Sequence, residues 1–302
     1  MPRPNLERLQ AAPLIGGPVH LLRAAKYSFG ERLWLYRQQQ NRQPAILVYQ
    51  MGKVGSRTVY MTLRSLELPH PIYHVHWLSP AGIRAEEDRY RAAGAKIERH
   101  LRESQSLRWQ LDRQPDRQWW IVTLVRDPVA RRISELFEQI RLYYPELTLS
   151  DGGVHVEGVL ARMEAAFTNY AERTDKCHVW FESELKQVFG IDIFDHPFDR
   201  EAGYGLVELG RVRLLALRLE DLDRNTDRIG SFVGHPAPLS LVKANVAENK
   251  SYAAAYQTVT TTFKLPASLC RTIYDSRYAR HFYSPEMRAA LARRWSQEEG
   301  RA

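Results

Sequence analysis

The sequence is poor in cysteine and has no long apolar run. Its two cysteines, Cys177 and Cys270, form no CxxC pair and no metal-ligand spacing. Reduced thiols are therefore expected, and nothing in the spacing requires a disulfide or a metal ion. No stretch approaches the ~20 apolar residues of a membrane span. We expect a cytoplasmic protein with neither a signal peptide nor a transmembrane segment.

Basic residues outnumber acidic ones, but they form no basic tail and no low-complexity block. The formal net charge is +8, with 43 Lys and Arg against 35 Asp and Glu. Such a balance favours anionic partners: nucleotides, nucleic acid, acidic glycans or a membrane surface. Because the arginines are spread along the whole chain, a nucleic-acid partner is disfavoured.

Apolar runs alternate with helical patterns along most of the chain. Strands are expected at residues 45–49, 72–77, 119–125 and 212–219. Helices are expected at 56–66, 128–140, 158–174, 180–188 and 221–233, and twice within 80–113. This alternation predicts an α/β fold, a P-loop-like parallel β-sheet flanked by helices, with helical insertions and a helical C-terminal tail.

A helical leader, residues 1–43, is expected before a single domain, residues 44–302. Residues 19–38 could form a basic amphipathic helix. Packing of this helix on the domain is favoured over peripheral contact with a membrane.

A phosphate-binding loop is predicted directly after the first strand. Glycines let the backbone approach a ligand closely, and the start of the next helix offers N–H groups to an anion. Lysine adds a full charge, and hydroxyls add donors. The lysine precedes the last glycine, so the loop is not a Walker A motif, in which lysine follows it. An ordinary strand-to-helix turn is the alternative. The candidate residues are Gly52, Lys53, Val54, Gly55, Ser56, Arg57 and Thr58.

A second candidate segment follows the strand at 119–125. Arg126 stands at its carboxyl end, where α/β folds place ligands, and Ser134 follows two helical turns later. A guanidinium and a hydroxyl brought together in this way can grip one phosphate. A salt bridge of Arg126 and a buried helical serine are the alternatives.

Taken together, the two segments resemble the 5′- and 3′-phosphate sites of sulfotransferases that use 3′-phosphoadenosine 5′-phosphosulfate (PAPS). Leu217–Leu222 resembles a strand end of this superfamily, and Tyr274–Glu286 resembles the C-terminus of bacterial sulfotransferases associated with capsular polysaccharide synthesis. The resemblance covers about residues 45–140 and 212–285. Residues 141–211 match no family that we can name, and acceptor specificity is expected there.

The resemblance implies transfer of a sulfuryl group from PAPS to an acceptor hydroxyl, with adenosine 3′,5′-bisphosphate as the product and a glycan as the first-choice acceptor. It implies that Lys53 stabilises the leaving phosphate. It also implies a loop that closes over the nucleotide, with Asn245 and Lys250 as candidates, although a polar surface loop explains these two residues equally well.

A general base is needed to take the acceptor proton, and histidine suits neutral pH. His74 and His76 alternate along the second strand and therefore share one face of it. His76 is the first candidate and His74 the second, with a structural role left open for both. His100 and His281 are weaker candidates.

Two other functions remain open from the sequence. A P-loop kinase or NTPase acting on a small molecule would share the sheet and the anion loop, although the lysine position and the lack of an evident Mg²⁺ aspartate pattern count against it. A non-catalytic basic protein that binds an anionic polymer would show salt-dependent binding and no nucleotide effect.

Overall fold

The computed structural model describes residues 42–297 without 95, 98, 151, 169–175, 237–238 and 243–250, and adds Gly30 and Leu33. The chain divides into two compact units, Met1–Asn41 and Arg42–Ala302, and every element named below belongs to the second unit. Apart from Gly30 and Leu33, the expected helix at residues 19–38 lies outside the described residues, as do Asn245 and Lys250.

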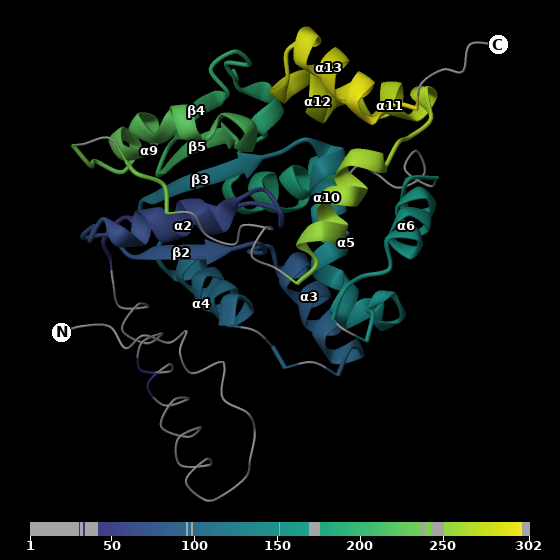
Figure 1. Ribbon diagram of the computed structural model, residues 1–302. Helices are drawn as coiled ribbons and strands as arrows, with labels where there is room; N and C mark the ends of the chain where they lie inside the picture. Colours follow the sequence, from purple (N-terminus) through teal and green to yellow (C-terminus); the bar gives the residue numbers. More distant parts are fainter. Residues whose placement is uncertain are drawn as a thin grey trace, which may run out of the picture. The chain divides into compact units, whose positions relative to one another are not determined.

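A five-stranded sheet, in the order β2-β1-β3-β5-β4, forms the centre of the second unit (Figure 1). Four of the strands are parallel and β4 pairs antiparallel with β5. The strands are β1 (Ala45–Tyr49), β2 (Ile72–Val75), β3 (Trp119–Val125), β4 (Tyr204–Leu209) and β5 (Val212–Arg218). The predicted α/β class is confirmed.

Two strands differ from the sequence prediction. β2 ends at Val75 rather than at residue 77, because its pairing with β1 ends where β1 ends, at Tyr49. β4 was not predicted. It is an edge strand with Leu206 and Leu209 exposed, so it lacks the continuous apolar run that marks the buried strands.

Helices make up most of the remainder, and the predicted helical tail is confirmed. They are α2 (Ser56–Ser65), α3 (Pro80–Ala92), α4 (Arg99–Arg113), α5 (Pro128–Tyr143), α6 (Val156–Thr168), α7 (Lys176–Trp180), α8 (Gln187–Phe189), α9 (Thr226–Phe232), α10 (Ala253–Thr262), α11 (Ala267–Tyr274), α12 (Arg277–Phe282) and α13 (Pro285–Trp295). A π-helical segment, Phe181–Lys186, joins α7 to α8. Short 3₁₀ turns occupy Pro145–Leu147, Ile193–Asp195, Leu219–Asp221 and Asp223–Asn225.

Helices cover the sheet and form a second core beside it. α2 and α4 pack against β2 (Figure 1). Beside the sheet, a hydrophobic cluster joins α5, α6, α10, α11 and α13 around buried side chains such as Phe137, Phe167 and Trp295.

The strand order places the two predicted phosphate segments side by side. From β1 the chain first crosses to β2 on one side and later to β3 on the other. In open α/β sheets, ligands bind at the carboxyl ends of the strands where the direction of winding reverses. The loop after β1 and the start of α5 after β3 both lie at this position.

Candidate active site

The loop between β1 and α2 has an unusual backbone. Lys53 has φ 71° and Gly55 has φ 80°, both in the left-handed region. Glycine adopts this region freely, whereas for lysine it costs energy and is typical of functional loops. Gly55 is the N-cap of α2 and provides no side-chain hydrogen bond to the helix start. The first N–H groups of α2 therefore have no side-chain cap from this position.

The Arg126 side chain joins the two predicted segments. Its Nη1 donates to the carbonyl oxygen of Lys53 at 3.0 Å, and its Nη2 donates to the Tyr256 hydroxyl at 3.3 Å. The Tyr278 hydroxyl lies 3.0 Å from the backbone nitrogen of Arg126 and 2.9 Å from its carbonyl oxygen. Arg126 is thus held at its side chain by the lysine loop and at its backbone by α12.

The Lys53 side chain lies against α5. Its Nζ forms an ion pair of 3.1 Å with Glu138, whose side chain is 45% exposed. Ser134 lies one helical turn before Glu138, so both residues belong to the same face of α5. Lys53 and Arg126 therefore meet at their predicted positions, and Ser134 lies one turn from the Glu138 partner of Lys53. Glu138 is not among the predicted site residues.

The remaining loop residues differ in their exposure. Val54 and Ser56 are buried, Gly52 and Thr58 are half-buried, and Arg57 is exposed. The Thr58 backbone nitrogen donates to the carbonyl of Gly55 at 3.1 Å, which forms the first turn of α2.

The two predicted histidines contact this loop directly. His74 Nε2 lies 2.9 Å from the Ser56 hydroxyl, and His76 Nδ1 lies 2.8 Å from the carbonyl oxygen of Gln50. Their rings are 5.1 Å apart, and the His100 ring lies 5.9 Å from that of His76. The prediction that His74 and His76 share one face is confirmed.

The hydrogen bond to Gln50 defines the tautomer of His76. A carbonyl oxygen only accepts, so Nδ1 carries the hydrogen and Nε2 is the nitrogen that takes up a proton. The pKa of His74 is well below its ordinary value, because the ring is buried and because His76, His100 and Arg57 add positive charge. His74 is therefore a neutral ring near pH 7.

The Gln50 side chain is a second buried polar group at this position. Among the described residues, neither its amide nitrogen nor its amide oxygen has a hydrogen-bond partner, although the residue is fully buried. Most buried polar groups in folded proteins are paired, and exceptions concentrate at functional sites. The unpaired amide of Gln50 and the left-handed backbone of Lys53 are thus two separate signs of a functional site at this loop.

Asp127 and Glu220 connect the carboxyl ends of β3 and β5 to the C-terminal helices. Asp127 accepts from the hydroxyl of Tyr274 at 2.7 Å and from the indole of Trp295 at 2.7 Å. Glu220 accepts from the backbone nitrogen of Asp127 at 2.8 Å and from the hydroxyl of Tyr283 at 3.4 Å. Burial raises the pKa of both carboxyl groups.

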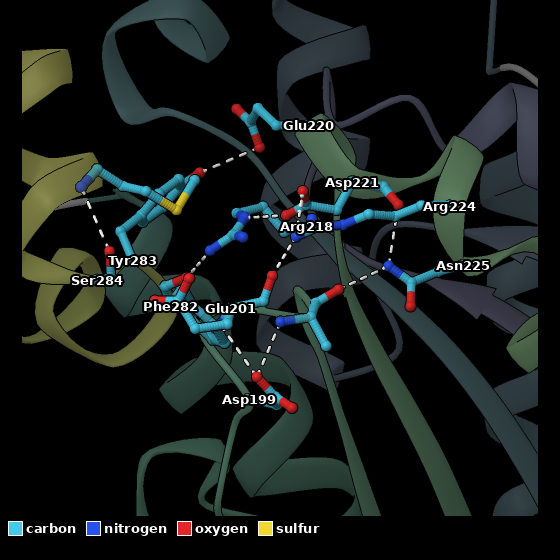
Figure 2. A network of polar contacts seen from close by, with 12 residues as sticks. Asp199, Glu201, Arg218, Glu220, Asp221, Arg224, Asn225, Phe282, Tyr283 and Ser284 are labelled. Carbon is cyan, nitrogen blue, oxygen red and sulfur yellow. Dashed lines mark hydrogen bonds and ion pairs between the residues drawn. The ribbon is translucent and has the colours of Figure 1, made fainter.

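Arg218, at the end of β5, is fully buried, and Figure 2 shows its contacts with Asp221 and Phe282. It donates to Asp221 and, at 2.7 Å, to the carbonyl of Phe282. Asp221 also pairs with Arg224. The helix expected at residues 221–233 begins only at Thr226, because Leu219–Asp221 and Asp223–Asn225 form 3₁₀ turns. These contacts give Glu220 and Asp221 a structural role at the end of β5.

His281, one of the two weaker histidine candidates, lies on α12 at a cavity of about 370 Å³ rather than among the residues of the Lys53 loop. The cavity is lined by Phe194, Asp275, Arg277, Arg280 and His281. Burial, with Arg200 and Arg277 nearby, lowers the pKa of His281 to about 4.

Comparison with known protein families gives a match for part of the chain. A family model, NKWYS, described as "Putative capsular polysaccharide synthesis protein", matches residues 163–284. This stretch is less than half of the 302-residue chain and includes part of the region, 141–211, for which the sequence analysis named no family. Searches of curated proteins and of solved structures give no match. Among the described residues, no helix has the length and apolar character needed to cross a membrane.

Proposed function

We propose that the protein is a sulfotransferase that moves a sulfuryl group from PAPS to an acceptor hydroxyl on a glycan, in the cytoplasm. The observation that carries the proposal is the hydrogen bond from the Arg126 guanidinium to the carbonyl of Lys53, 73 positions away. It joins the segment assigned to the 3′-phosphate to the segment assigned to the 5′-phosphosulfate. The similarity of residues 163–284 to a capsular polysaccharide synthesis family supports a glycan as the acceptor.

In this proposal the Lys53 loop binds the leaving group. Charge builds on the leaving phosphate as the acceptor oxygen attacks in line, and positive groups placed there stabilise the transition state. The ion pair of Lys53 with the exposed Glu138 is of a kind worth only about 0–1 kcal/mol, so a phosphate can replace the carboxylate. The N–H groups at the start of α2 supply further donors.

His76 acts as the general base in this proposal. With Nδ1 donating to Gln50, Nε2 can accept the proton of the acceptor hydroxyl as the new S–O bond forms. The S–O bond to the phosphate breaks at the same time, and adenosine 3′,5′-bisphosphate leaves. Ser134, on the same face of α5 as the Lys53 partner, is proposed to bind the 3′-phosphate with Arg126.

A panel of nucleotides in a thermal-shift assay tests the function. Adenosine 3′,5′-bisphosphate should raise Tm more than adenosine 5′-phosphate or ATP with Mg²⁺, since a ligand stabilises by RT ln(1 + [L]/Kd). A larger shift with ATP and Mg²⁺ would favour a kinase or NTPase. No shift with any nucleotide, together with salt-dependent binding of a polyanion, would favour a non-catalytic binding protein.

A further inference from the structure

The backbone that follows His76 is held by residues from a distant part of the chain. The indole Nε1 of Trp180 donates to the carbonyl oxygen of His76 at 2.9 Å. The backbone nitrogens of Leu78 and Ser79 donate to Oε2 of Glu184 at 2.7 and 2.9 Å. Three hydrogen bonds with Trp180 and Glu184, at the backbone of residues 76, 78 and 79, therefore fix this segment.

The Glu184 carboxylate is suited to this position as an acceptor. It is fully buried and accepts two further bonds, from the Ser79 hydroxyl at 2.5 Å and from the Tyr49 hydroxyl at 2.6 Å. Tyr49 is the last residue of β1, directly before the lysine loop. Burial raises the pKa of Glu184, whereas the hydrogen bonds from Leu78, Ser79 and Tyr49 lower it. Three of these donors face Oε2, which therefore has to be an acceptor oxygen, whereas the Ser79 hydroxyl at Oε1 can both donate and accept.

The local backbone is built around this carboxylate. Trp180 and Glu184 are four residues apart at the start of the π-helical segment, Phe181–Lys186, so both side chains face residues 76–79. A Cβ atom at Gly82, in the first turn of α3, would overlap Oε1 of Glu184. Glycine at position 82 therefore leaves room for the carboxylate beside the N-terminus of α3.

From these contacts we infer that Trp180 and Glu184 are positioning residues for His76, the proposed general base. They fix the backbone on the C-terminal side of the histidine, while Gln50 holds its ring. Tyr49 connects the same carboxylate to the strand that carries the lysine loop, so one group sets the position of the base relative to the leaving-group site. The inference rests on the proposed function only for the chemical role of His76.

The first test measures the His76 ring itself and needs no activity. In Glu184→Gln, the donors of Leu78, Ser79 and Tyr49 lose their charged acceptor, so residues 76–79 are held less firmly. The titration midpoint of the His76 ring, followed by NMR of its Cε1–H signal, should then move by about 0.5 pH unit or more. The control is Glu86→Gln, which changes another buried carboxylate, on α3. It should leave the titration midpoint of His76 unchanged. An unchanged midpoint in Glu184→Gln overturns the inference. Should that variant not fold, Ser79→Ala, which removes one of the donors to Glu184, replaces it. A shift of the His76 midpoint is again expected, and an unchanged midpoint overturns the inference.

The second test uses sulfuryl transfer and a double-mutant cycle. Glu184→Gln should lower turnover about tenfold or more in the wild-type background, but less than about twofold in a His76→Ala background, because the residue it positions is absent. Equal losses in both backgrounds would show a merely structural role and overturn the inference. A wild-type protein that shows no transfer and no stabilisation by adenosine 3′,5′-bisphosphate would contradict the proposed function, and the NMR result would still decide the positioning role.

Discussion

Two regions of the molecule contribute to the candidate site in different ways. The residues that would touch the ligand, Lys53, His76 and Arg126, lie within residues 45–140. Many of the residues that hold these side chains, their backbone or the neighbouring Asp127 lie in the C-terminal half: Trp180, Glu184, Tyr256, Tyr274, Tyr278 and Trp295. Most of this second set lies within residues 163–284, the stretch that matches the capsular polysaccharide synthesis family. In the proposed function, one region supplies the reacting side chains and the other supplies much of their support.

This difference predicts that substitutions in the two regions will have different effects. A change in the first region should lower turnover and leave the fold intact, since these side chains are partly exposed at a loop. A change in the second region removes a buried hydrogen bond, and the free energy of unfolding should fall with it. Substitutions in each region test whether the effects on turnover and on stability separate in this way.

His76→Ala should show the largest loss of turnover, about 10²–10⁴-fold, the usual contribution of a general base. Stabilisation by adenosine 3′,5′-bisphosphate should persist, because His76 is assigned to no phosphate. His74→Ala is the comparison: its ring has a lowered pKa and should matter less as a base. Turnover lost in His74→Ala and kept in His76→Ala would reverse the two roles, and activity in the double variant would place the base elsewhere.

Lys53→Ala should lower turnover about 10²–10³-fold while PAPS affinity falls less, because leaving-group charge is largest in the transition state. Steady-state kinetics at saturating PAPS measures the effect. Lys186→Ala is a matched control, since Lys186 also pairs with an acidic side chain, Asp192 at 2.8 Å, but lies away from the loop. Normal turnover in Lys53→Ala would show that Lys53 contributes at most to the binding of PAPS and not to the chemical step.

Much of the fold was predictable because it depends on local patterns. β1 and β3 were predicted to the residue, and β5 to within one, since each is a run of buried apolar side chains. β4 was missed, although the two residues between Leu209 and Val212 form a tight connection with Gly210 at φ 54°, a hairpin signal that could have found it.

The supporting part of the site was not predictable in the same way. Glu184 and Tyr49 are 135 positions apart, and Trp180 and His76 are 104 apart. A single sequence shows that a strand ends in a polar loop. It does not show which distant side chain will form hydrogen bonds with the residues beside that loop. The lysine, arginine and histidine candidates were identifiable from local motifs, and their partners were not.

Tyr274→Phe tests the second region. It removes the hydroxyl that donates to the buried Asp127 at 2.7 Å, and the free energy of unfolding should fall by about 1–3 kcal/mol in urea titrations. Tyr283→Phe is the matched control, because its bond to Glu220 is longer, at 3.4 Å, and its loss should cost less. An equal or larger cost for Tyr283→Phe would contradict the assignment of Asp127 as the better-bonded group.

The smallest effect is expected at His281. Its folded-state pKa of about 4 lies below the unfolded value of about 6.5, so the unfolded chain binds more protons between these values. The wild type should therefore lose stability relative to His281→Gln as pH falls from about 6.5 to about 4, by about 1 kcal/mol for a partly exposed ring. Urea titrations at several pH values measure the difference, which should be constant above pH 7. A difference independent of pH throughout would contradict the burial of an uncharged ring.

The central claim is that the loop after β1 and the segment after β3 form one site for adenosine 3′,5′-bisphosphate. The most direct test compares the affinities of wild type and Arg126→Ala for this ligand and for adenosine 5′-phosphate, measured by calorimetry. A charged hydrogen bond to a phosphate is worth about 1.5–3 kcal/mol. Arg126→Ala should therefore lose about tenfold or more in affinity for the bisphosphate and much less for the monophosphate. Equal losses for both ligands, or no binding of either by the wild type, would contradict the account.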